Sequence, residues 1–136
     1  MLQFSSAVPV LRVADVARSV AWYQSILGFR ATLVPSVAPH DTCHLRRDQV
    51  ELMLRKTTGT PALRIPTHQG WDVLIRLSGQ ALIALLDEAR RRTPLVRGPE
   101  ITADGIVEFE LEDPDGHRVC IAEQLLETRG IPRAVG

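Results

Sequence analysis

Two carboxylates and two thiols are the first candidates for chemistry in this chain of 136 residues. Glu51 and Asp72 lie on separate predicted strands, and two carboxylates that approach one another can act in general acid–base catalysis. Two carboxylates that line a cavity more often set the electrostatic potential of that cavity than transfer protons. Cys43 and Cys120 also lie on separate predicted strands, without the close spacing of a zinc site.

The four histidines do not form a recognisable metal motif. His40 and His68 fall in predicted loops, His117 follows a predicted turn, and His44 lies on a predicted strand. None has the helical spacing of four residues that brings two ligands to one metal ion, so we interpret them as surface or structural residues. The sequence also contains no nucleophile elbow, phosphate-binding glycine loop or dinucleotide fingerprint.

The stretch from 106 to 123 indicates how the chain folds. Val107, Phe109 and Leu111 alternate with glutamates, which is the period of a strand that is wetted on one face. The sequence Asp-Pro-Asp-Gly at 113–116 predicts a tight turn, and an apolar strand follows it. Residues 42–56 repeat this plan around a polar turn, so we predict two copies of a strand-helix-three-strand unit.

Upstream of each hairpin the sequence predicts one strand, one helix and a further strand. In the first copy these are a strand at 7–13, a helix between the N-cap Asp15 and Gly28, a strand at 29–35 and a loop at 36–41. In the second they are a strand at 71–77, a helix at 80–92 and a short edge strand at 95–97. We therefore expect a single domain 1–136 with modules at about 7–56 and 71–125, a connector at 57–70 that is either a linker or a functional flap, and a tail at 126–136.

Composition narrows the possible partners. The formal net charge is +0, and no basic stripe is present, so nucleic acid is not an expected partner. No run is long and apolar enough to span a bilayer, and the start of the sequence lacks the features of a secretion signal. With two cysteines and no disulfide framework, a reduced cytoplasmic protein is expected.

If each strand keeps its alternation, one face of the sheet collects an apolar floor with charges of both signs. The first copy would contribute Val8, Val10, Arg12, Glu51, Met53 and Arg55. The second would contribute Asp72, Leu74, Arg76, Glu108, Glu110, Cys120 and Ala122. Such a face is typical of a small-molecule crevice. A single β-bulge would move a strand's residues to the other face.

These segments resemble the vicinal-oxygen-chelate superfamily, the group of glyoxalases, bleomycin-resistance proteins and extradiol dioxygenases. The matching pieces are 9–15 (Pro-Val-Leu-Arg-Val-Ala-Asp) with Ser19, Tyr23 and 27–29 (Leu-Gly-Phe), then 50–52 (Val-Glu-Leu), then 112–118 (Glu-Asp-Pro-Asp-Gly-His-Arg). The resemblance implies an α+β fold of two βαβββ modules that form an open, cup-shaped mixed sheet, commonly paired in a dimer. It also implies a ligand crevice.

Metal enzymes of this superfamily place two metal ligands on each module. The corresponding positions here are Val8, Glu51, Asp72 and Cys120. Val8 has no donor atom, and a cysteine in place of a carboxylate changes the ligand class. The resemblance therefore implies that the metal centre has been lost, so we expect no metal ion, no cofactor and no catalytic residue.

Members that have lost the metal are typified by the bleomycin-resistance proteins, which sequester a drug unchanged. We thus expect a homodimer that binds a bulky aromatic or peptide-like antibiotic. Trp22 and Trp71 are candidate stacking platforms, and packing in the core or in a dimer interface is the alternative for each. A divalent-metal lyase or dioxygenase with an altered site around Glu51 and Asp72 is the second hypothesis. An interaction domain whose cup is filled by its own side chains is the third.

Overall fold

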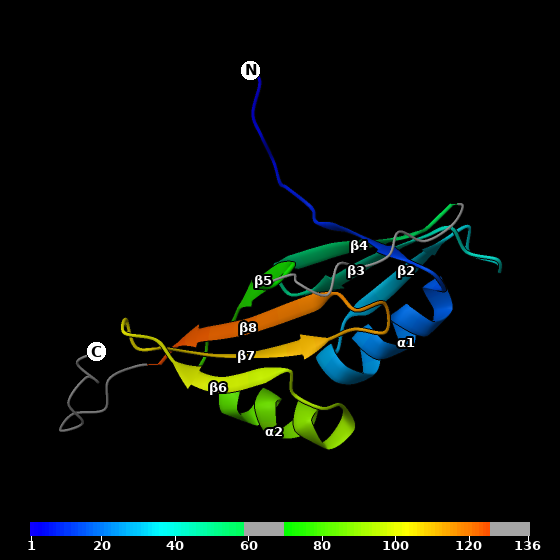
Figure 1. Ribbon diagram of the computed structural model, residues 1–136. Coiled ribbons are helices and arrows are strands. Elements are labelled where there is room, and N and C mark those ends of the chain that lie inside the picture. Colours follow the sequence, from blue (N-terminus) through cyan, green and yellow to red (C-terminus); the bar gives the residue numbers. More distant parts are fainter. Residues whose placement is uncertain (59–69, 126–136) are drawn as a thin grey trace. The chain divides into compact units, whose positions relative to one another are not determined.

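The computed structural model describes residues 1–58 and 70–125, and the chain divides into two compact units, residues 1–63 and 64–136. The division falls within the predicted connector, most of which (59–69) lies outside the described residues, as does the predicted tail at 126–136. Each unit consists of a four-stranded sheet and one helix (Figure 1). Within the described ranges, no helix is long and apolar enough to cross a membrane.

The first unit has the predicted βαβββ order. Its elements are β1 (Val10–Val13), α1 (Val16–Leu27), β2 (Arg30–Val34), β3 (Thr42–Arg47) and β4 (Val50–Lys56). The strands lie side by side in the order β1-β4-β3-β2. β1 runs parallel to β4 and the other pairs are antiparallel, so the sheet is mixed.

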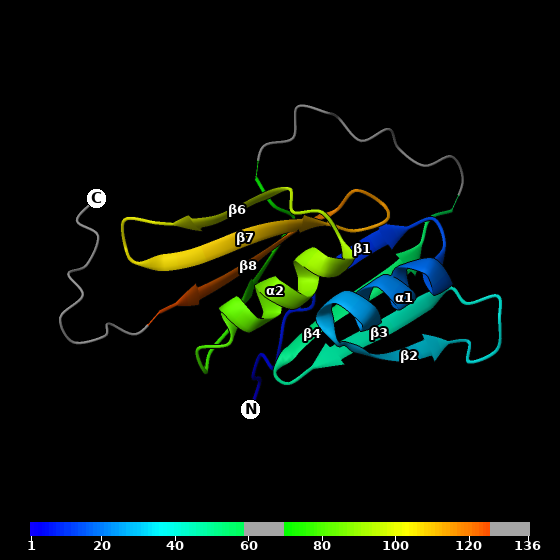
Figure 2. The same cartoon turned by 90° about the horizontal axis from the view of Figure 1, so that it is seen from below.

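Helix α1 covers one face of this sheet and leaves the other face open (Figure 2). The Asp15 carboxylate accepts the backbone N–H of Arg18, and Gly28 ends the helix with φ 68°, as the sequence predicted. This φ lies in the left-handed region that side chains rarely adopt, which explains why glycine is favoured here. The helix stripe packs on the buried alternate residues of the strands, which are Leu11, Val13, Cys43, Leu45, Leu52 and Leu54.

The second unit repeats the plan. Its elements are β5 (Val73–Arg76), α2 (Leu82–Arg92), β6 (Arg97–Ile101), β7 (Ile106–Glu112) and β8 (Arg118–Gln124). The strand order is β5-β8-β7-β6, with β5 parallel to β8 and the remaining pairs antiparallel. The predicted α+β class with two βαβββ modules is thereby confirmed.

The hairpin of β7 and β8 closes as its turn residues predicted. The Gly116 N–H donates to the Asp113 carbonyl at 3.0 Å, and Gly116 adopts φ 85°. The Asp113 carboxylate, only 4% exposed, also accepts the N–H groups of Asp115 and His117 at 2.9 and 2.8 Å. This aspartate therefore organises the turn as well as entering it.

Three elements of the second unit have bounds that differ from those predicted. The strand expected at 71–77 is the shorter β5. The edge strand expected at 95–97 begins at Arg97 and continues to Ile101, because a register shift between Arg97 and Glu100 lets pairing with β7 resume. The helix expected from Gln80 begins at Leu82, since Gln80 itself has φ 60°. The N–H groups of Gln80 and Leu82 donate to the buried carboxylate of Glu123 on β8, at 2.8 and 2.9 Å. This distant side chain replaces the local cap that Ala81 lacks.

Candidate functional site

The strand phases predicted for the first unit are correct. Val10 pairs with Met53 and Arg12 pairs with Arg55, so these side chains share the face opposite α1. Glu51 belongs to the same face because it lies two residues before Met53 on β4. Five of the six residues predicted for this face are therefore brought together. The sixth, Val8, precedes β1, which begins at Val10 and not at residue 7 as predicted.

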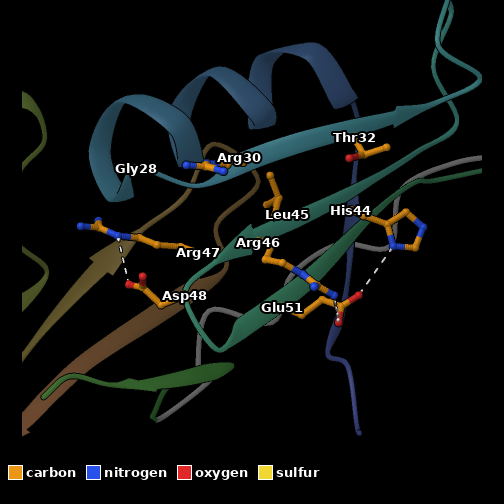
Figure 3. A pocket seen from close by; sticks show the side chains of 9 residues that line it. All are labelled: Gly28, Arg30, Thr32, His44, Leu45, Arg46, Arg47, Asp48 and Glu51. Carbon is orange, nitrogen blue, oxygen red and sulfur yellow. Dashed lines mark hydrogen bonds and ion pairs between the residues drawn. The ribbon is translucent and has the colours of Figure 1, made fainter. Parts of the chain in front are cut away.

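A hollow of about 800 Å³ lies at the β2 side of this face. Figure 3 shows its lining, which is Gly28, Arg30, Thr32, His44, Leu45, Arg46, Arg47, Asp48 and Glu51. The Glu51 carboxylate lies 3.1 Å from Arg46 Nη2 and 3.9 Å from His44 Nδ1 (Figure 3). Of the six residues predicted for this face, Glu51 alone is among the residues that line the hollow.

The arginines and the histidine of this hollow were not among the site residues predicted from the sequence. The signal was present, because Arg30 and Thr32 alternate on β2 and His44 and Arg46 alternate on β3. Register pairs Arg30 with Arg46, and Arg46 with Glu51. The period that identified β4 would have placed these residues on the same face.

The phases predicted for the second unit are also correct. Leu74 pairs with Cys120, which in turn pairs with Glu110, and Arg76 pairs with Ala122, which pairs with Glu108. All of these side chains therefore occupy the face of the second sheet that lies opposite α2 and the buried Val107, Phe109 and Ile121. On this face Glu110, Cys120 and Ala122 are also buried.

Arg97 on β6 pairs with the acidic side chains of this face. It was not among the site residues predicted from the sequence. Its guanidinium lies 2.6 Å from Glu110, 2.7 Å from Glu100 and 2.9 Å from Glu108. The hydrogen bond with Glu110 raises the pKa of Arg97, so this side chain stays charged. The acidic side chains thus form an ion-pair network around one arginine and do not stand as a bare carboxylate pair.

Cys120 lies beneath this network and is fully buried. Burial, with a further contribution from the Glu108 charge, raises the pKa of its thiol to about 11, and Arg97 Nη2 lies 3.8 Å from its sulfur. A thiol with this pKa is protonated at neutral pH, so it is a weak nucleophile.

A smaller hollow of about 140 Å³ lies on the second unit, beside β5, β7 and β8. Its lining is Trp71, Leu74, Arg76, Leu77, Ile106, Glu108, Ala122, Glu123 and Gln124. The Trp71 side chain is 43% exposed and so is available for stacking. Four predicted site residues, Trp71, Leu74, Arg76 and Glu108, meet here.

Two predicted site residues lie elsewhere. The Asp72 carboxylate accepts the backbone N–H of Arg118 at 2.8 Å and does not line either hollow. Trp22 lies on α1, with its ring edge-on to Tyr23 at 4.8 Å between ring centroids. Since α1 covers the opposite face of the first sheet, Trp22 is not brought together with the open-face residues of its unit (Figure 2).

The residues at the family's metal positions do not fit a divalent cation. Glu51 is paired with Arg46, Asp72 is held by the Arg118 N–H, the Cys120 thiol is protonated, and Val8 has no donor. In residues 1–58 and 70–125, no group of three or more histidine, cysteine, aspartate and glutamate side chains is arranged to hold a metal ion.

Comparison with known proteins adds the following findings. The family model of the Glyoxalase/Bleomycin resistance protein/Dioxygenase superfamily matches residues 5–121. A search of curated proteins found no match. The crystal structure of TioX from Micromonospora sp. ML1 superposes with a TM-score of 0.70 at 17% identity, covering 91% of this chain and 99% of that chain.

Two further structures show the same fold. Lactoylglutathione lyase from Agrobacterium tumefaciens has a TM-score of 0.66 at 16% identity, covering 88% of this chain and 92% of that chain. A virulence protein from Salmonella typhimurium has a TM-score of 0.65 at 22% identity, covering 92% of this chain and 100% of that chain. At these identities, the likeness to each structure concerns the fold alone.

Proposed function

Because the chain belongs to the glyoxalase/bleomycin resistance protein/dioxygenase superfamily, a group of both enzymes and resistance proteins, we propose that it is a non-catalytic binding protein. Its ligand is a bulky aromatic or peptide-like antibiotic, which it sequesters unchanged. The observation that carries this proposal is the state of the donors at the family's metal positions. Glu51, Asp72 and Cys120 are each engaged by another group or protonated, so no open coordination site is prepared for a metal-activated substrate.

The hollow beside Trp71 supports an aromatic ligand. Its volume of about 140 Å³ resembles the roughly 150 Å³ cavity that suffices for one benzene ring. The exposed indole offers a stacking surface, and Leu74 and Ala122 supply an apolar floor. Glu108 and Arg76 at the same hollow provide charges of both signs to orient polar substituents.

A ligand of drug size is larger than one ring, so this hollow binds only part of it. We propose that a second copy of the chain completes the crevice, as a homodimer. Such a crevice buries more of the ligand's surface than either open sheet face alone. If a homodimer completes the crevice, the amount of bound ligand should follow the amount of dimer. Sedimentation with and without ligand measures both.

Tryptophan fluorescence tests the proposal because the chain has two tryptophans, one in each unit. Trp22→Phe leaves Trp71 as the reporter, and the matched variant Trp71→Phe leaves Trp22. Bleomycin, mitomycin and a DNA-intercalating peptide are the probes. We expect a saturable change in the Trp71-only protein with at least one probe and a much smaller change in the Trp22-only protein.

The state of the bound compound separates capture from catalysis. Mass spectrometry of the compound released by denaturation should recover it unaltered after prolonged incubation. A chemically changed product that requires added divalent metal would contradict the proposal. So would the absence of any saturable Trp71 response across the panel.

A further inference from the structure

The hollow of the first unit contains a charge arrangement that the proposed function does not explain. Arg30 on β2 and Arg46 on β3 are directly opposite one another in the antiparallel register. Like charges in this position destabilise a strand pair, because the side chains of opposed residues lie close together. A counter-charge beside either arginine therefore reduces this repulsion.

Only one of the two arginines has a counter-charge within the described chain. Arg46 Nη2 lies 3.1 Å from Glu51 Oε2, and Glu51 is its register partner on β4. Arg30 makes no ion pair and no side-chain hydrogen bond with any residue of the ranges 1–58 and 70–125. Arg30 is exposed and lines the hollow, and its guanidinium carries five N–H donors.

Neighbouring groups extend this donor set. Thr32 follows Arg30 on the same face of β2, and its register partner His44 lies beside Glu51 with Nδ1 at 3.9 Å from the carboxylate. A hydroxyl and an imidazole can each donate a hydrogen bond to an oxygen atom in the hollow. All of these residues line the hollow, and Figure 3 shows the His44 ring and the Arg46 side chain on either side of the Glu51 carboxylate.

The remaining charge of the lining is nearly balanced. Arg47 donates from Nη1 to the Leu27 carbonyl at 2.6 Å and lies 3.9 Å from Asp48, so its guanidinium ties the end of α1 to the hairpin. With Arg46 matched by Glu51 and Arg47 by Asp48, Arg30 is the excess charge.

We infer that this hollow binds an anionic group, a carboxylate or a phosphate, with Arg30 as its principal ligand and Arg46, Thr32 and His44 as supporting donors. A planar guanidinium pairs with two oxygens of either group through parallel N–H donors. An anion between Arg30 and Arg46 also relieves the repulsion across the strand pair. The inference stands on the first unit alone and does not depend on the antibiotic proposed above.

A nuclear magnetic resonance titration of the full chain tests the site. Methyl phosphate and acetate are the probes, added at constant ionic strength against chloride so that general screening does not change. We expect saturable shifts of the backbone amides at 30–32 and 44–51 with at least one probe. The tighter of the two probes identifies the preferred anion.

Variants locate the binding to Arg30. Arg30→Gln should weaken the probe by about tenfold, the usual order for losing a charge-assisted hydrogen bond from a partly exposed site. Arg30→Lys, which keeps the charge and loses the fork, should fall between Arg30→Gln and the wild type. The matched control is Arg55→Gln, which removes the same charge from the same open face but does not line the hollow.

Three results would overturn the inference. Shifts that fail to saturate, or that spread over every arginine-bearing surface, would show only non-specific attraction. An equal loss of affinity in Arg55→Gln and Arg30→Gln would assign the effect to the net charge of the face. The spectrum of each variant reports its fold directly. If Arg30→Gln is misfolded, the affinity of Arg30→Lys for the probe decides whether Arg30 is the ligand.

Discussion

The ion-pair network around Arg97 gives a prediction with an internal control. Arg97 contacts Glu110 at 2.6 Å and Glu100 at 2.7 Å, so the two distances are nearly equal. The two carboxylates differ in exposure, because the Glu110 side chain is 5% exposed and that of Glu100 is 55% exposed. Comparing the two pairs therefore isolates the effect of burial on an ion pair formed by one guanidinium.

The expected energies follow from that difference. A hydrogen-bonded pair with a buried carboxylate should couple by about 2–3 kcal/mol. An exposed pair should couple by about 0.2–1 kcal/mol, because water screens it. Arg97→Met alone should lower the free energy of unfolding by about 3 kcal/mol, since it leaves Glu110 buried without its partner.

Double-mutant cycles measure both couplings. The first combines Arg97→Met with Glu110→Gln, and the second combines Arg97→Met with Glu100→Gln. Urea unfolding is followed by Trp71 fluorescence in the Trp22→Phe background, because Trp71 belongs to the same unit as the network. A coupling for Glu100 that equals or exceeds the coupling for Glu110 would refute the argument from burial.

Three further predictions concern the same unit. In urea unfolding, Gly98→Ala should destabilise this unit by about 2–4 kcal/mol and Gly79→Ala by about 1 kcal/mol. The two glycines have similar φ values, +89° and +88°, but a Cβ at Gly98 would meet the Glu108 carbonyl at 2.7 Å, whereas nothing lies within 4 Å at Gly79. Equal losses of stability would contradict this explanation. Glu123→Gln should cost about 1–2 kcal/mol by the same assay, because the α2 N-terminus loses an anionic cap, whereas Gln124→Glu at the exposed neighbouring position should cost far less. The Cys120 thiol should resist a thiol-specific disulfide reagent at pH 8 until the protein is unfolded. With a pKa of about 11, only about one thiol in a thousand is ionised at that pH. Rapid labelling of Cys120 in the native protein, located by peptide mass spectrometry, would argue against its burial.

The strand phases were predictable because alternation is a local property of the backbone. The open-face positions of Met53, Leu74, Glu108 and Cys120 follow from a period of two and need no tertiary information. The caps of α1 were predictable for the same reason, since Asp15 and Gly28 act on neighbouring residues.

The residues that were missed act over long sequence separations. Arg97 pairs directly with Glu110, and the register shift between Arg97 and Glu100 places Glu100 opposite Glu108. No local pattern fixes where a strand shifts its register, so the contacts of Arg97 with these carboxylates could not be predicted. Glu123 caps a helix 41 residues earlier in the chain. Asp72 and Glu51 were correctly identified as acidic residues on or near strands, but their partners Arg118 and Arg46 come from other strands.

Arg30 and Arg46 illustrate a different reason for a missed site. Both lie on strands whose alternation was legible, but the predicted face of the first copy drew only on the strands at 7–13 and 50–56. The hollow is lined mainly by residues of β2 and β3, with Glu51 from β4. The opposed positions of Arg30 and Arg46 depend on the register of β2 against β3, which alternation alone does not fix.

Metal analysis of the protein shows whether the residues at the family's metal positions can hold a divalent cation. The full chain is incubated with zinc, nickel, manganese and ferrous ions in turn, dialysed against metal-free buffer, and analysed for bound metal. Our account predicts well below one ion per chain for each metal, because Glu51, Asp72 and Cys120 are engaged or protonated. A stoichiometric ion that survives dialysis and disappears in Glu51→Ala would contradict it.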